Sequence, residues 1–174
     1  LNFVEGVTRA NELIAPLDEN GGICILTSAE TDVIADVVGY LPVGSPLQTV
    51  APERVLDTRP EAVITSSTAQ PFKTSVSGRL AAGADVAVVI ADRANTPADA
   101  DLVVLNITVA NPGARGFLSV HDCAVPPSNT SVLNYEAGVN GANEMIVQLD
   151  SSGEICIFSS AATDLVIDIV GYTR

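Results

Sequence analysis

The chain has 174 residues, and its 21 acidic against 8 basic side chains give a formal net charge of −13. Nucleic acid and anionic membrane surfaces are disfavoured as partners, because binding to either needs a basic surface. No apolar run approaches the roughly 20 residues of a membrane-spanning helix, so membrane insertion is not expected.

Residues 1–42 are repeated without a gap at residues 133–174. Leu1 corresponds to Leu133 and Cys24 to Cys156, both at an offset of 132, and about half of the aligned positions are identical. A fixed period marks an array of like domains. We therefore interpret residues 1–42 as the C-terminal part of a preceding β-repeat, residues 43–50 as a short Pro/Gly linker, and residues 51–174 as a complete β-sandwich repeat.

The first segment is too small to fold well alone. At about 40 residues it is near the limit below which a lone core needs outside help. We expect its missing N-terminal part, a packed neighbour or another chain to supply strands.

The complete repeat shows the short apolar period of β-strands. In residues 101–110, for example, Val103, Leu105 and Ile107 would share one face. Turn residues separate such stretches, and no helix of three turns is predicted. The sequence thus predicts an all-β protein, an antiparallel jelly-roll-like β-sandwich or a related barrel. The further strands that we predict are residues 84–91, 116–122, 144–149, 154–159 and 164–171, with a weaker one at 71–77.

The repeat also accounts for the odd number of cysteines. Cys123 and Cys156 both lie in the complete repeat and can pair with each other. Cys24 is the counterpart of Cys156, so its partner would lie about ten residues before Leu1. A disulfide would place the protein in an oxidising, extracellular compartment. The alternative is three buried thiols.

Two acids, Asp164 and Asp168, lie on one face of the last predicted strand. An acid in so apolar a strand needs a partner, because an unpaired buried charge is very costly. We expect a structural ion pair between Asp168 and Arg59, whose planar guanidinium can hold a carboxylate with two hydrogen bonds. The alternative is that Asp168 faces water at a sheet edge.

The best cation candidate is an acidic loop formed by Asp92, Asn95, Asp99 and Asp101. Calcium favours several oxygen ligands on a flexible loop. The spacing matches no EF-hand, however, and acidic loops are usually just solvated. We therefore expect neither a metal nor another cofactor, with calcium at this loop as the alternative.

Catalytic residues are not predicted. His121 is the only histidine, and Cys123, which could form a nucleophilic pair with it, is already assigned to the disulfide with Cys156. No nucleophile elbow, zinc motif or phosphate loop is present. Asn129, in an exposed turn, begins a formal glycosylation sequon.

A set of motifs runs through the complete repeat in a fixed order, at residues 54–59, 104–109, 116–120, 131–135 and 163–172. This order resembles the "LDTR … NVT … GFLTV … SNLN … DVVGY" repeats of large secreted and surface proteins of actinobacteria and related bacteria. The resemblance implies an extracellular β-domain, in tandem or attached to a secreted hydrolase, without established catalytic residues. Cys123 and Cys156 are similar to the family's paired cysteine positions.

From these observations we expect a non-enzymatic structural or adhesive repeat module of a large extracellular or cell-surface protein. Open sheet edges invite pairing with another chain, so the sharper hypothesis is self-assembly into a filament or sheath. Its partners would be other copies or adjacent repeats. The competing hypothesis is a carbohydrate- or surface-binding module on a secreted hydrolase, with cell-surface glycans as partners. The scarcity of aromatic residues argues against that alternative.

Overall fold

The computed structural model describes the whole chain except residues 38, 61–75, 77 and 129. The described residues form strands and no helix. A membrane-spanning helix is therefore absent from this part of the chain. Nearly all of the weaker strand predicted at residues 71–77 lies outside the described residues. The strands are β1 (Gln48–Asp57), β2 (Ala84–Val89), β3 (Leu102–Ala110), β4 (Gly116–His121), β5 (Leu133–Tyr135), β6 (Gly141–Gln148), β7 (Glu154–Ser159) and β8 (Asp164–Tyr172).

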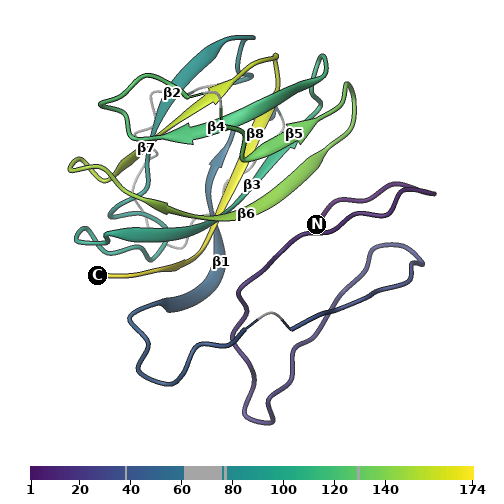
Figure 1. Cartoon of the computed structure of the whole chain (residues 1–174), viewed down its shortest axis with the longest axis vertical. Coiled ribbons are helices and arrows are strands. Elements are labelled where there is room, and N and C mark those ends of the chain that lie inside the picture. Colours follow the sequence, from purple (N-terminus) through teal and green to yellow (C-terminus); the bar gives the residue numbers. More distant parts are fainter. Residues whose placement is uncertain (38, 61–75, 77, 129) are drawn as a thin grey trace.

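These strands form two four-stranded sheets that pack together (Figure 1). One sheet has the order β1-β8-β3-β6 and the other the order β2-β7-β4-β5. All strand pairs within them are antiparallel. The predicted all-β sandwich is confirmed.

The core lies between the sheets and is aliphatic. The central strands β8 and β3 bury Ile167 and Ile107 opposite each other, and β7 buries Ile155 and Ile157 from the second sheet. All four side chains are almost fully excluded from solvent. Because full burial of such a side chain contributes about 1.5–3 kcal/mol, these strands supply much of the stability of the sandwich.

Strand β1 differs most from the sequence prediction, because it begins at Gln48, inside the range expected as a linker. Its pairing with β8 shifts register between Thr49 and Glu53. Pro52 lies in this interval, and β1 is an edge strand, where a proline is tolerated. The proline and the register shift interrupt the alternation that would have revealed the strand.

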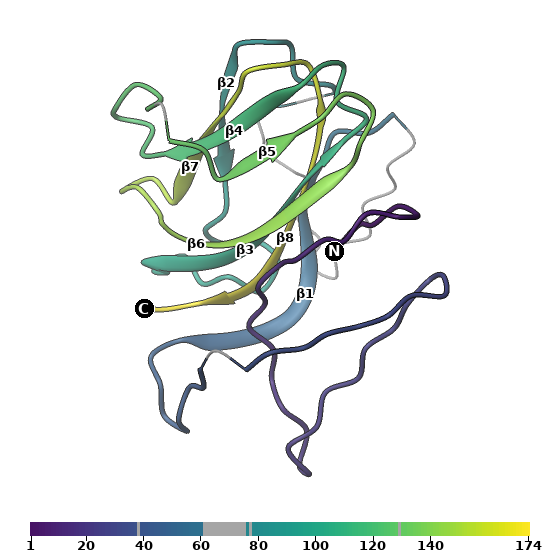
Figure 2. The same ribbon diagram turned by 45° about the vertical axis from the view of Figure 1, so that its right-hand side comes forward.

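The N-terminal segment, residues 1–42, lies beside the sandwich as long loops without a strand in its described part (Figures 1 and 2). It contacts the exposed edge of β6. The backbone N–H of Ile14 donates to Oε1 of Glu144 at 2.7 Å, and the N–H of Glu144 donates to Oδ1 of Asn11 at 3.2 Å. The described part of the segment thus contacts the sandwich but adds no strand to it.

Candidate functional site

The predicted ion pair of Asp168 forms with a different arginine. Arg54 lies opposite Asp168 in the antiparallel pairing of β1 and β8, and its Nε is 2.6 Å from Oδ1 of Asp168. Arg59 instead places Nη2 2.6 Å from Oδ2 of Asp57. The expected Arg59–Asp168 pair is therefore replaced by Arg54–Asp168, because β1 ends at Asp57 and Arg59 lies beyond it.

Asp57 is held between two arginines. Its side chain is 2% exposed, and it accepts hydrogen bonds from Arg59 and from Nη1 of Arg54 at 2.8 Å. The hydrogen bonds from Arg59, with the positive charge of Arg54, hold the pKa of Asp57 below its usual value. Asp168 in turn raises the pKa of Arg54 by accepting its hydrogen bond. These four side chains form a network of ion pairs, in which the Arg54–Asp168 pair joins β1 to β8.

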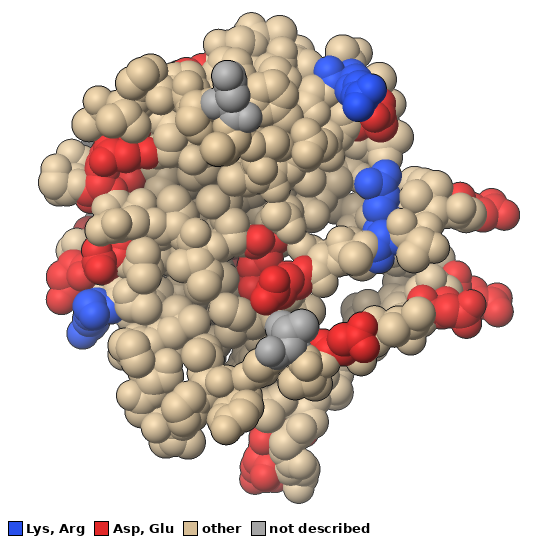
Figure 3. All heavy atoms as spheres, viewed as in Figure 1, with Lys and Arg blue, Asp and Glu red and all other residues tan. Residues whose placement is uncertain are grey.

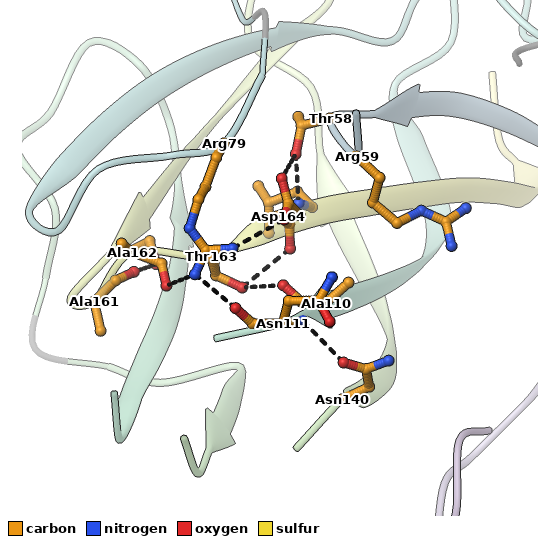
Figure 4. A network of polar contacts seen from close by, with 12 residues as sticks. Thr58, Arg59, Arg79, Ala110, Asn111, Asn140, Ala161, Ala162, Thr163 and Asp164 are labelled. Carbon is orange, nitrogen blue, oxygen red and sulfur yellow. Dashed lines mark hydrogen bonds and ion pairs between the residues drawn. The ribbon is translucent and has the colours of Figure 1, made fainter. Parts of the chain in front are cut away.

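A second polar cluster surrounds Asp164 at the start of β8 (Figure 4). Its carboxylate is buried and lies 2.9 Å from Nη1 of Arg79. Thr58 donates from Oγ1 to Asp164 at 3.3 Å and accepts from the N–H of Leu165 at 2.8 Å. Arg59 points away from this cluster (Figure 4).

Arg79 also binds the backbone. Nη2 of Arg79 donates to the carbonyl oxygens of Asn111 at 2.6 Å and of Ala162 at 3.0 Å. One guanidinium therefore joins the end of β3, the turn before β8 and the buried acid. The sequence indicates that Asp164 needs a partner, but it does not indicate Arg79, because no periodic pattern marks the loop that carries this arginine.

The predicted disulfide between Cys123 and Cys156 is confirmed. It joins the residue two positions after β4 to the middle of β7, across 33 residues of sequence. A loop of this length predicts a stabilisation of about 3–4 kcal/mol in the chain-entropy model. Cys24 is an exposed free thiol.

His121 has a hydrogen-bond partner for each ring nitrogen. Nε2 lies 3.1 Å from Oδ1 of Asp85, and Nδ1 lies 2.9 Å from the carbonyl oxygen of Asp122. Its neighbour Cys123 also lies near Asp150 and Glu154. Since the thiolate is the form that acts as nucleophile or metal ligand, the disulfide-bonded Cys123 offers neither function here.

The acidic loop considered for calcium is used for contacts at the surface. Asn95 donates from Nδ2 to Oε2 of Glu53, Asp99 pairs with Arg174 at 3.3 Å, and Asp101 accepts from Gln148 at 3.3 Å. Within the described part of the chain, the carboxylates of Asp92, Asp99 and Asp101 do not gather into one cluster. Asn129 lies outside the described residues, so its glycosylation stays a prediction.

The N-terminal segment exposes the positions that form the core in the complete repeat. Ile155 and Ile157 are 0% exposed, whereas their counterparts Ile23 and Ile25 are 49% and 58% exposed. The difference is largest for Ile169, at 0%, whose counterpart Val37 is 92% exposed. A sequence patterned for a sandwich core is therefore left uncovered.

The polar counterparts are uncovered as well. Asp32 corresponds to Asp164 and Asp36 to Asp168. Neither takes part in an ion pair with any other described residue. With the free thiol of Cys24, three groups that have partners in the complete repeat face solvent in the segment. Several acidic side chains lie over this part of the molecule (Figure 3).

A hollow opens between the N-terminal segment and the turn before β6. Phe3 and Arg9 line it from the segment, and Asn111 and Asn140 from the sandwich. Asn140 already accepts a hydrogen bond from the N–H of Asn111. The lining combines one aromatic ring with amide and guanidinium groups.

Comparison of the chain with protein-family models, with curated proteins and with solved structures finds no match.

Proposed function

We propose that residues 1–174 are a non-enzymatic structural or adhesive module of an extracellular protein built from β-repeats. One observation carries the proposal. The same 42-residue pattern occurs twice in the chain, folded as β5–β8 in one copy and uncovered in the other. A module whose sequence repeats in this way is suited to extension and attachment.

The use of charged and sulfur-containing side chains supports this role. Arg54, Asp57 and Asp168 join β1 to β8, and Arg79 with Asp164 joins the ends of β3 and β8. The disulfide joins β4 to β7. These interactions tie neighbouring strands together, which is the requirement of a domain that bears load outside the cell.

Assembly would use the open edges of the two sheets. The edge strands are β1 and β6 in one sheet and β2 and β5 in the other. Edge strands present unpaired backbone groups to other chains, and β6 already accepts contacts from the N-terminal segment. We propose that adjacent repeats or further copies associate at these edges.

A carbohydrate- or surface-binding module is the second candidate, and the hollow lined by Phe3, Arg9, Asn111 and Asn140 favours it. Guanidinium and amide groups bind sugar hydroxyls, and an aromatic ring can stack against a sugar ring. Glycan-array binding that is lost in Arg9→Ala and Phe3→Ala would select this alternative.

The experiment that tests the structural role combines electron microscopy and light scattering over a range of protein concentrations with a screen for hydrolase activity. We expect particles that grow with concentration and no hydrolysis of ester, glycoside or peptide substrates. Monodisperse monomers with a hydrolytic activity that His121→Ala abolishes would contradict the proposal.

A further inference from the structure

We propose that the N-terminal segment is a docking segment for a half-sandwich with the pattern of β1–β4. This inference rests on the proposed structural role and names its partner. The segment repeats the sequence of β5–β8 but lacks in its described part the strands that those elements form.

The complete repeat shows what covers this pattern. Strand β7 pairs with β2 and β4, and β8 pairs with β1 and β3. Ile157, for example, lies opposite Val86 on β2 and Val120 on β4. Its counterpart Ile25 has an exposed side chain. The occupant that fits the segment is therefore a polypeptide with the apolar pattern of residues 48–121.

The two aspartates and the cysteine of the segment further restrict which polypeptide could be its partner. In the complete repeat, Asp168 pairs with Arg54 on β1, Asp164 with Arg79, and Cys156 with Cys123. The segment carries Asp36, Asp32 and Cys24 at the corresponding positions. The partner must therefore supply two guanidinium groups and a thiol at matching places. This requirement distinguishes it from an arbitrary apolar surface.

A second copy of this chain does not satisfy the requirement. Residues 1–174 contain the β5–β8 pattern twice and the β1–β4 pattern once. If copies of the chain exchange these halves with one another, each chain still contributes two β5–β8 halves and one β1–β4 half. One β5–β8 half per chain then stays without a partner, whatever the number of copies. The occupant is a β1–β4 half that does not already hold its own β5–β8 half.

The first test joins a second copy of residues 43–132 ahead of Leu1, which keeps the whole chain intact. The junction Val132–Leu1 then reproduces the Val132–Leu133 junction of the complete repeat. In the fusion, Cys24 can form a bridge with the added copy of Cys123 by exchange with oxidised glutathione. The two thiols lose two protons and two electrons, and the glutathione disulfide becomes two molecules of reduced glutathione.

We expect the free thiol of Cys24 to disappear, and the amides of residues 23–25 and 32–37 to become protected from hydrogen exchange. The matched control is the same fusion with Ile23→Asp and Ile25→Asp, in which the segment stays open. A reactive Cys24 with unprotected amides, in a fusion that keeps its Cys123–Cys156 bridge, would overturn the proposal. So would burial of the segment in the unfused chain by self-association alone.

A second variant decides the question if the fusion misfolds. Gln48 pairs with Tyr172 at the end of β8, and Tyr40, the counterpart of Tyr172, precedes Gln48 by a short loop. The segment can therefore replace residues 133–174 on β1–β4 of the same chain, with residues 41–47 as a hairpin loop. Such a replacement would use the same antiparallel pairing.

The full-length variant Cys156→Ser, Ile157→Asp, Ile167→Asp disables the resident half. With oxidised glutathione present, we expect a Cys24–Cys123 disulfide in peptide mapping. A free Cys24 would count against the docking role. Failure of either test would leave the proposed structural role standing, since that role is tested by particle growth and the hydrolase screen.

Discussion

Arg54 and Asp168 lie opposite each other on neighbouring antiparallel strands, and their side chains are 2.6 Å apart. The same guanidinium contacts Asp57, which is almost completely buried. Arg54 therefore binds two carboxylates at once, and the edge strand β1 is held to the sheet by ion pairing as well as by backbone hydrogen bonds.

Replacement of Arg54 tests this arrangement. Arg54→Met should lower the free energy of unfolding by about 1–3 kcal/mol, because it leaves a buried carboxylate with one partner fewer. Arg59→Met is the matched control and should cost less than about 1 kcal/mol, since Arg59 is more exposed and Asp57 keeps Arg54. Urea unfolding measures both. A larger loss for Arg59→Met would show that Arg59 is the principal partner.

The depressed pKa of Asp57 predicts a dependence of stability on pH. Because the folded state binds this proton less tightly than the unfolded state, the contribution of Asp57 is complete above the ordinary aspartate pKa. It is lost as the pH falls through the lower, folded-state pKa. Melting temperatures measured from neutral to strongly acidic pH should show this loss. The loss should be smaller in Asp57→Asn, and an unchanged acid transition in that variant would refute the assignment.

The cluster around Asp164 should be more sensitive than the surface pairs. Asp164→Asn removes the negative charge, while Arg79 still reaches the backbone carbonyls. We expect the free energy of unfolding to fall by about 2–3 kcal/mol. This is less than for a fully buried pair, because Arg79 is partly exposed. Asp99→Asn, at an exposed pair with Arg174, is the control and should be nearly neutral. Equal effects in the two variants would show that burial does not strengthen the pair.

Glu144 couples the N-terminal segment to β6 in a pH-dependent way. Burial is the main cause that raises its pKa, and the negative charge of Glu12 adds to this, although the hydrogen bond from Ile14 lowers it. The contact is therefore fully favourable below the ordinary glutamate pKa and weakens as the pH rises through the raised one.

At neutral pH, Glu144→Gln should then increase the hydrogen-exchange protection of residues 11–14, because a neutral amide can still accept from Ile14. Glu136→Gln, an exposed site next to Arg115, is the control. Reduced protection in Glu144→Gln would mean that the charge itself holds the segment.

The sequence revealed the strands whose alternation is strong and the disulfide. It also indicated that Asp164 and Asp168 need partners. The prediction of Arg59 as the partner of Asp168 is wrong, because the pairing follows strand register, which puts Arg54 opposite Asp168. Strand β1 was hidden by Pro52. Arg79 could not be found, because its contacts with Asn111 and Ala162 exist only once β3 and β8 are folded side by side.

The central claim is that residues 1–42 and 133–174 are two versions of one half-sandwich. Strands β1–β4 cover the apolar side chains of the second version, whereas those of the first are exposed. Peptide-resolved hydrogen exchange on the whole chain tests it most directly, by comparing residues 23–25 with residues 155–157. We expect the first peptide to exchange rapidly and the second to be protected as strongly as the core. Equal, strong protection of both peptides in dilute, monomeric protein would contradict the account.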